Sequence, residues 1–176
     1  MLTPAQRFTC MSHNRAKNTG PELLLRRSLW QKGFRYRVND KRFPGSPDIL
    51  LPKYHTAIFV NGCFWHGHKG CTNYTIPKTN TDYWIAKVQR NQERDQKVWR
   101  KLEAMGWNVL IVWECRLKKE LLDSTVNQLI DTISKNGENY KNAMVRRRQA
   151  NADYLMNQQL RKEKELAALN EIKSIP

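Results

Sequence analysis

The apolar residues of the first sixty positions form a helical pattern followed by strand patterns. The helical pattern predicts a helix that begins after Thr19, with Glu22 placed to complete a capping box. Residues 34–38 alternate as a half-exposed strand would, and residues 48–51 and 56–60 are short apolar runs typical of buried strands. Only a short connection joins these two runs, so we expect them to pair in antiparallel fashion.

The middle of the chain predicts a long helix between two buried strands. Residues 82–105 have a helical pattern that ends at Gly106, and residues 107–113 form a continuous apolar run. A strand, a long helix and a second buried strand predict a crossover onto the same sheet. A further helix is expected over residues 117–134.

These elements predict an α/β fold in one domain with an appendage at each end. We expect a basic N-terminal arm at residues 1–18, a folded domain at 19–136 and a charged, helical tail at 137–176. The N-terminus lacks the apolar region of a signal peptide, and no apolar stretch approaches the roughly 18 to 20 residues of a membrane span. We therefore expect a protein of the cytosol that does not bind membranes.

The charge of the chain points to a polyanionic partner. Lys and Arg number 31 against 16 Asp and Glu, which gives a net charge of +15, and the excess is spread from Arg15 to Arg148. The chain also has six tryptophans, and aromatic rings beside positive charge suit base stacking or insertion between bases. The alternative is that most of these rings fill the core.

Closely spaced cysteine and histidine residues predict a metal site. Cys63, His68 and Cys71 have the spacing C-x4-H-x2-C, and Cys115 follows the last apolar strand. Three thiolates and an imidazole suit a closed, tetrahedral structural zinc site that would hold its loop rigid. The alternative is that Cys115 is a small buried residue and the others are free thiols; Cys10 lies outside the cluster.

A second group of residues suggests catalysis by a hard cation. Asp48 follows a turn and precedes a strand, where a carboxylate could bind Mg2+, although a turn Asp is the commoner explanation. The next strand brings Val60 and Asn61 beside it. His66 lies in the metal loop without being needed as a ligand, so it is a candidate general base. Glu22 has two interpretations, as a capping partner or as a contact to metal-bound water.

Two polar residues interrupt the apolar face of the long helix. Asn91 and Asp95 share this face with five apolar residues, and buried polar groups of this kind need partners. We therefore expect the N-terminal half of this face to lie against the active site, with Asn91 and Asp95 as supporting residues. The alternative is that the helix begins as a projection and buries only its last turns. The apolar members are Trp84, Val88, Val98, Trp99 and Leu102.

These residues, taken together, resemble the very short patch repair (Vsr) DNA mismatch endonucleases. The similarity is carried by residues 44–48, 58–68, 83–95 and 106–115, in the family's order and with nearly the same gaps. It implies a restriction-endonuclease-like mixed β-sheet flanked by helices, with a structural zinc ion. It also implies Mg2+-dependent hydrolysis of one DNA strand, 5′ to the thymine of a T:G mismatch that arises when 5-methylcytosine deaminates.

The resemblance assigns roles to individual residues of the catalytic site. It implies that Asp48 and the carbonyl of Val60 bind Mg2+, that His66 is the base and that Glu22 is a supporting acid. Asn61 stands where well-known members carry a second histidine, so either Asn61 substitutes by hydrogen bonding or turnover is weaker. The Glu-x-Lys half of a restriction-type nuclease site is absent here, as it is in this family.

The resemblance also implies a function for the aromatic residues. Phe64, Trp65 and Trp84 correspond to the side chains that enter the duplex beside the mismatch. Opening a base step costs a few kcal/mol, and a mismatched step opens more easily than a paired one. The zinc site would present Phe64 and Trp65 as a preformed wedge, although His68 and Cys71 are one residue further apart than in the best-known member.

Two other functions compete with mismatch nicking. A non-catalytic, zinc-stabilised DNA-binding module would account for Asn61 and for the net charge of +15. A nuclease of the same fold could instead cut fully paired sites. The expected partner is double-stranded DNA in the bacterial cytosol, with other repair proteins as further partners, and the protein is expected to be a monomer.

Overall fold

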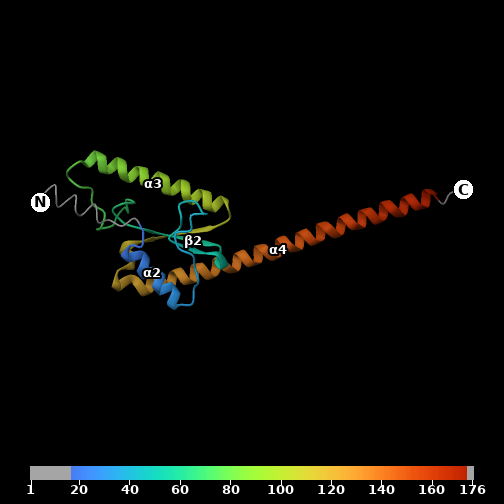
Figure 1. Cartoon of the computed structure of the whole chain (residues 1–176), viewed down its shortest axis with the longest axis horizontal. Coiled ribbons are helices and arrows are strands. Elements are labelled where there is room, and N and C mark those ends of the chain that lie inside the picture. The colour runs from blue at the N-terminus through green and yellow to red at the C-terminus, as the bar shows by residue number, and fades with distance from the viewer. Residues whose placement is uncertain (1–16, 174–176) are drawn as a thin grey trace. The chain divides into compact units, whose positions relative to one another are not determined.

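The computed structural model describes residues 17–173, and the chain divides into two compact units, residues 1–137 and 138–176. The expected basic arm at 1–18 therefore lies almost wholly outside the described residues. The elements in chain order are α2 (Gly20–Gln31), β1 (Ile49–Leu51), the 3-10 helix η1 (Pro52–Tyr54), β2 (Thr56–Asn61), α3 (Thr81–Ala104), β3 (Asn108–Trp113), the 3-10 helix η2 (Glu114–Leu117) and α4 (Lys119–Lys173) (Figure 1).

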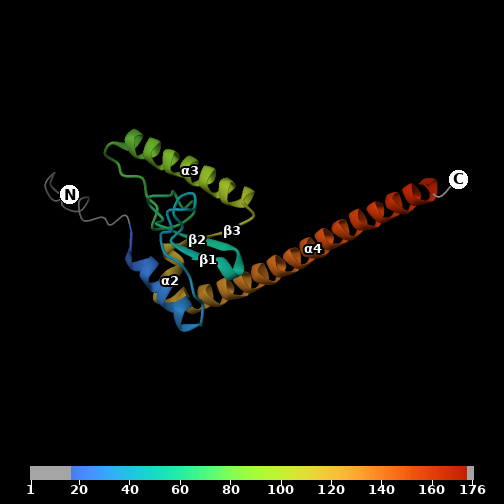
Figure 2. The same cartoon turned by 45° about the vertical axis from the view of Figure 1, so that its right-hand side comes forward.

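The described strands form one mixed sheet in the order β1-β2-β3. β1 and β2 are antiparallel, with Ile49 opposite Ile58, because only η1 and His55 separate them. β2 and β3 are parallel, with Asn61 opposite Trp113, because α3 carries the chain back between them (Figure 2). The mixed α/β architecture, the antiparallel pair and the crossover predicted from the sequence are confirmed.

The sheet is covered on both faces, and the alternation along β2 assigns each face to different helices. Ile58 and Val60 pack into a core shared with α2 and the first part of α4, whereas Ala57 and Phe59 pack into a second core with α3. In Figure 1, α3 and α2 lie on opposite sides of β2. The larger core includes Leu25, Leu29, Ile49, Val126 and Ile133, all buried.

The strand expected at residues 34–38 is not formed. Its backbone makes a single antiparallel bridge, in which Arg37 and Leu50 exchange two hydrogen bonds of 2.8 Å. Two residues later the chain enters the left-handed conformation at Asn39, where φ is 46°. This turn carries the backbone away from β1 before a second pair of hydrogen bonds can form.

The helix expected at 117–134 begins at Lys119 and continues without interruption through Gly137 into the second unit. Gly137 therefore does not end the helix, although glycine lowers helix propensity. A Cβ at position 137 would lie 2.7 Å from the Cδ1 atom of Tyr54. The glycine allows the helix backbone to approach this ring closely. None of the helices in residues 17–173 is long and apolar enough to span a membrane.

Two substitutions in α4 test the packing of its first part. Ile133 is fully buried in the core, whereas Val145, twelve residues further along the same helix, is 64% exposed. We expect Ile133→Ala to lower the free energy of unfolding by about 2 to 5 kcal/mol, because it leaves a cavity. Val145→Ala should change it by less than about 0.5 kcal/mol. Urea unfolding measures both, and equal effects would contradict this packing.

Candidate functional site

One end of the sheet gathers the predicted catalytic and metal-binding residues. Asp48 immediately precedes β1, and β2 ends at Asn61, so the antiparallel pairing places both at the same end. β3 runs parallel to β2 and ends beside Asn61, which brings Cys115 to this end as well. The loop of residues 62–71 leaves β2 here.

Asp48 is held by the backbone of the neighbouring strand. The N–H of Val60 donates a hydrogen bond of 2.8 Å to its Oδ2 atom. Burial raises the pKa of Asp48 to about 6, against the opposing effect of this hydrogen bond, and the negative charge of Glu22 raises the pKa further. A partly buried carboxylate with one oxygen on a backbone N–H keeps lone pairs for a cation.

A buried ion pair in α2 supports the Asp48 backbone. Arg26 and Glu22 are 6% and 4% exposed, and Arg26 Nη2 lies 3.0 Å from Glu22 Oε2. Arg26 also donates two hydrogen bonds, of 3.2 and 3.0 Å, to the carbonyl oxygen of Asp48. The capping box is not formed, because the Thr19 hydroxyl donates to Glu22 and makes no capping bond to the described helix backbone. Glu22 is therefore tied to Asp48 through Arg26.

His66 forms a hydrogen-bonded pair with Asp95 of α3, between the His66 Nδ1 and Asp95 Oδ2 atoms. Arg94 donates to the other carboxylate oxygen of Asp95 at 2.9 Å. Burial favours a raised pKa for Asp95, but the hydrogen bonds from His66 and Arg94 outweigh it and lower the pKa below its ordinary value. A carboxylate on Nδ1 fixes the ring and leaves the Nε2 atom available for proton transfer.

Two more side chains of α3 bind the loop backbone. Asn91 donates a hydrogen bond of 2.8 Å to the carbonyl of Trp65, and Gln92 donates one of 3.1 Å to the carbonyl of His66. Gly67 has a φ of 64°, and a Cβ there would lie 2.6 Å from the Gln92 amide nitrogen. The close approach of loop and helix therefore requires glycine.

Asn61 lies beside the His66–Asp95 pair in a cavity of about 410 Å3. The residue is 4% exposed, and its Nδ2 atom has no hydrogen-bond partner among the described residues. A buried amide without a partner is costly, so this donor is available to a ligand oxygen in the cavity. The cavity wall also includes Gln92, Gln96, Trp99 and Trp113.

The four predicted metal ligands come together. The ligand atoms of Cys63, His68, Cys71 and Cys115 all lie within 4.8 Å of one another, and His68 Nδ1 is 3.4 and 3.5 Å from the sulfurs of Cys63 and Cys115. Burial raises the pKa of Cys63, so its thiolate needs a compensating cation. A donor set of three sulfurs and one nitrogen fits a tetrahedral ion with no open position.

Neighbouring groups hold this cluster in place. The His68 ring stacks on Trp113 with centroids 4.1 Å apart and an interplanar angle of 1°. The Cys63 N–H donates a hydrogen bond of 2.9 Å to Glu114 Oε1. The cluster, β3 and η2 are thereby joined to the start of the loop.

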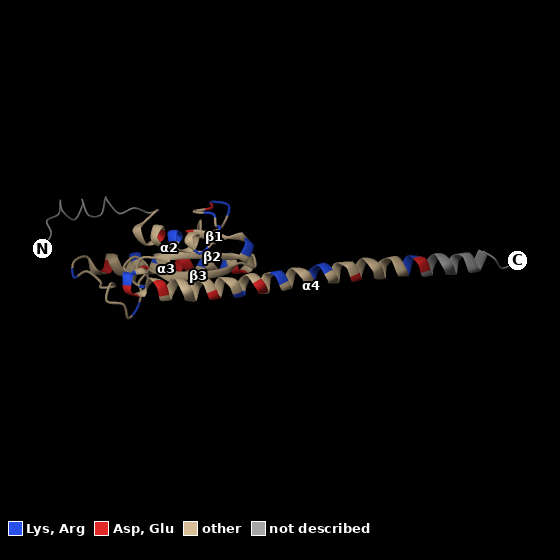
Figure 3. Ribbon diagram, turned by 90° about the horizontal axis from the view of Figure 1, so that it is seen from below, with Lys and Arg blue, Asp and Glu red and all other residues tan. Residues whose placement is uncertain are grey.

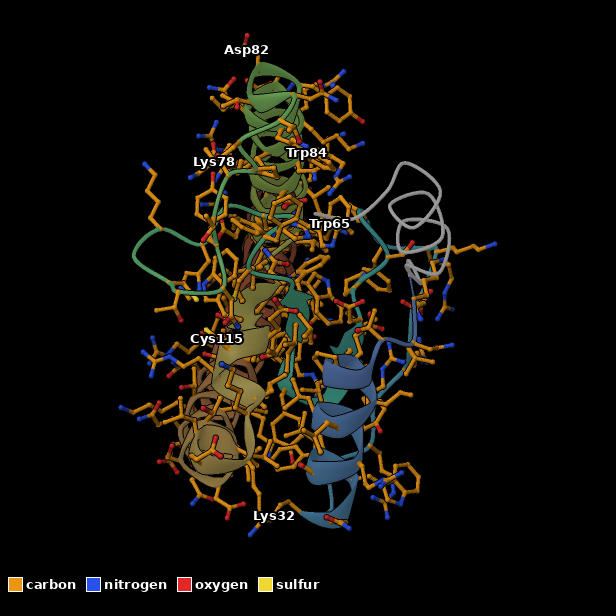
Figure 4. The ribbon with its side chains drawn as sticks, turned by 90° about the vertical axis from the view of Figure 1, so that its left-hand side faces the viewer. Lys32, Trp65, Lys78, Asp82, Trp84 and Cys115 are labelled. Carbon is orange, nitrogen blue, oxygen red and sulfur yellow. The ribbon has the colours of Figure 1, made fainter. Side chains whose placement is uncertain are left out.

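The aromatic residues form a surface group at the N-terminal end of α3. The Phe64 ring centroid lies 5.2 Å from that of Trp65 and 5.3 Å from that of Trp84, in edge-on contacts, and all three residues are half-buried. Trp65 and Trp84 are close together in Figure 4, away from Cys115. Tyr83, 55% exposed, adds an edge-on contact to Trp84.

Three supporting residues were not identified from the sequence. Arg26 lies four positions after Glu22, a spacing that favours an ion pair on a helix. Gln92 follows Asn91, one of the two polar residues noted in the apolar face of the helix, and Glu114 precedes the metal ligand Cys115. The contacts of Gln92 and Glu114 join segments far apart in the chain, so spacing alone did not predict them.

Known proteins with similar sequences are mismatch endonucleases and nicking enzymes. The chain matches the family model described as "DNA mismatch endonuclease Vsr" over residues 1–72. "Type II nicking enzyme V.NmeAIP" of Neisseria meningitidis serogroup A is 46% identical over 134 residues, which are 76% of this chain and 95% of that protein. "DNA mismatch endonuclease Vsr" of Escherichia coli K12 is 38% identical over 117 residues, 65% of this chain and 74% of that protein.

The extent of this similarity is sufficient to assign the family. Both relatives are more than 30% identical to the chain, and the chain covers more than two thirds of the length of each. The family model matches the segment that contains Glu22, Asp48, Asn61, His66 and three of the four metal-site residues. The chain therefore belongs to the Vsr family of DNA mismatch endonucleases.

Proposed function

We propose that this protein is a Mg2+-dependent endodeoxyribonuclease that nicks one strand of duplex DNA 5′ to the thymine of a T:G mismatch. It would act as a monomer in the bacterial cytosol and begin the repair of deaminated 5-methylcytosine. The observation that carries the proposal is the convergence of Asp48, Val60 and the His66–Asp95 pair at one end of the sheet. The likeness to enzymes named for mismatch cleavage and for nicking supports the same reaction.

The proposed Mg2+ site consists of the Asp48 carboxylate and the Val60 carbonyl. Oxygen ligands of this kind suit Mg2+, which keeps several waters and would stabilise the negative charge that develops on the cleaved phosphate. Arg26 orients this site by holding the Asp48 carbonyl and Glu22 together. The resulting sheet with flanking helices is, in our proposal, a small restriction-endonuclease-like fold.

His66 is the proposed general base. With the Nδ1 proton donated to Asp95, the Nε2 lone pair can take a proton from the water that attacks the phosphorus. Asp95 acts as a positioning residue, because it fixes the tautomer and stabilises the protonated ring. The Nδ2 donor of Asn61, which has no partner in the described part of the chain, is proposed to hydrogen-bond a phosphate oxygen or a water in the same cavity.

The aromatic group is the proposed mismatch wedge. Phe64 and Trp65 lie in the loop fixed by Asn91 and by the Cys63 cluster, so they need little ordering on binding. We assign the cluster to a structural Zn2+, because four thiolate and imidazole ligands leave no position for substrate. Because little conformational entropy is lost in ordering the wedge, more of the binding free energy remains to unstack the mismatched base step.

The first test is cleavage of an end-labelled duplex with one T:G pair. We expect a single Mg2+-dependent nick 5′ to the thymine, reduced by at least about a hundredfold in Asp48→Ala because a metal ligand is lost. The fully paired duplex and a scan of flanking sequences are compared in the same assay. Binding without a nick would favour the non-catalytic module, and equal cutting of paired DNA would favour the site-specific nuclease.

The pKa of Asp48 leads to a second prediction. Because burial raises this pKa to about 6, protons compete with Mg2+ for the carboxylate below that pH. We expect the single-turnover nicking rate at low Mg2+ to rise as the pH increases from about 5 to 7.

Raising the Mg2+ concentration should move the midpoint of this profile to lower pH, since the metal displaces the proton by mass action. The matched control is the rate at fixed pH over the same range of ionic strength, adjusted with NaCl. A midpoint that stays at the same pH for every Mg2+ concentration would show that Asp48 does not bind the catalytic metal.

A further inference from the structure

A basic groove lies between α3 and the turn at residues 44–45, in addition to the cavity that contains Asn61. It has a volume of about 410 Å3 and is lined by four cationic side chains and a single carboxylate. The cationic residues are Arg90, Arg94, Lys97 and Lys101, and the carboxylate is that of Glu93. Figure 3 colours the Lys and Arg positions of the ribbon blue and the Asp and Glu positions red.

We propose that this groove binds the sugar-phosphate backbone of the duplex next to the cleaved bond. The inference rests on the proposed function, because it takes double-stranded DNA as the ligand. It adds to that function a second contact region, separate from the aromatic wedge and from the catalytic residues.

The spacing of the cations suits a run of phosphates. The four residues follow one another at intervals of four, three and four, which keeps them on one side of the helix. Eleven residues of α-helix span roughly 16 Å. That length equals the axial rise of about five phosphates of one DNA strand, at about 3.4 Å each.

The charges in the groove are poorly neutralised by the protein. Arg94 pairs with Asp95, but within residues 17–173 no ion pair is found for Arg90, Lys97 or Lys101. The alternative is that these four cations form an ordinary solvent-exposed helix face with no ligand. Against it, the four cations gather around a hollow beside a turn of the chain, whereas a solvated face needs no concavity.

The groove also adjoins the catalytic site through its own residues. Gly45 lies three positions before Asp48, so one wall of the groove leads directly to the proposed Mg2+ ligand. On the other wall, Arg94 donates to the carboxylate of Asp95, the residue that holds His66. A strand whose phosphate is cleaved between Asp48 and His66 can therefore continue into this groove.

The test is the salt dependence of DNA binding by the double variant Lys97→Ala/Lys101→Ala. Within residues 17–173 neither lysine has a hydrogen bond or ion pair to a proposed catalytic residue, and both lysines are exposed, so folding should be kept. The matched control is Lys32→Ala/Lys135→Ala, which removes the same charge from two exposed positions. Lys32 follows α2 and Lys135 lies in α4, and these two helices pack on the face of the sheet opposite to α3. Lys32 lies far from Trp84 in Figure 4.

Binding is measured without Mg2+ on a paired duplex and on a T:G duplex of about 30 base pairs, over about 50 to 300 mM NaCl. We expect the slope of log K against log salt concentration to become shallower by about 2 in the groove variant, roughly 0.9 for each lost phosphate contact. The control should keep the wild-type slope. An unchanged slope in the groove variant, or an equal loss in the control, would overturn the proposal.

The outcome can be separated from that of the proposed function. Single-turnover nicking of the T:G duplex is measured on the wild-type protein alone, so the reaction is tested independently of the groove variant. A wild-type protein that binds DNA with a steep salt slope but never nicks would refute the proposed reaction and leave the groove test valid. A wild-type protein that nicks, combined with an unchanged slope in the variant, would refute the groove alone.

Discussion

Hydrogen bonds from α3 to the loop after β2 fix the His66 ring and the backbone of the loop that carries the aromatic wedge. Asn91 and Gln92 donate to loop carbonyls, and Asp95 holds the His66 ring. Without these partners the loop carbonyls would hydrogen-bond to water instead. The loop backbone, and the aromatic side chains attached to it, would then have no fixed orientation. The same helix presents Trp84 to the wedge and forms one wall of the basic groove.

Two groups at the site lower the stability of the fold. Asp48 is a partly buried carboxylate with a pKa near 6, and Asn61 carries a buried donor without a partner in the described residues. The fold would be more stable with an apolar or fully hydrogen-bonded group at either position. Both groups are therefore typical of a site in which a bound ligand supplies the missing interaction. The buried Arg26–Glu22 pair limits the cost at Asp48 by fixing its backbone, while the core formed by α2, α4 and the sheet supplies the stability.

Local patterns in the sequence predicted the helices, strands and metal ligands that are defined by residue spacing. They did not predict features that depend on contacts between residues far apart in the chain. The apolar periods indicated α2, α3 and the strands, and the spacing of Cys63, His68 and Cys71 indicated the metal cluster. The segment 34–38 has a strand pattern, but the turn at Asn39 leaves it only one bridge. The helix expected over residues 117–134 continues through Gly137, where a Cβ would lie against the ring of Tyr54, more than eighty residues earlier.

The most direct test of a preformed loop is amide hydrogen exchange in the free protein, before and after removal of the metal ion proposed to bind the Cys63 cluster. If the cluster and α3 together order the loop, the amides of Cys63, His66 and His68 exchange slowly in the metal-loaded protein. After metal removal they should exchange at least about a hundredfold faster, while β2 stays protected. Fast exchange in the metal-loaded protein, or no change on metal removal, would contradict a preformed wedge and catalytic loop.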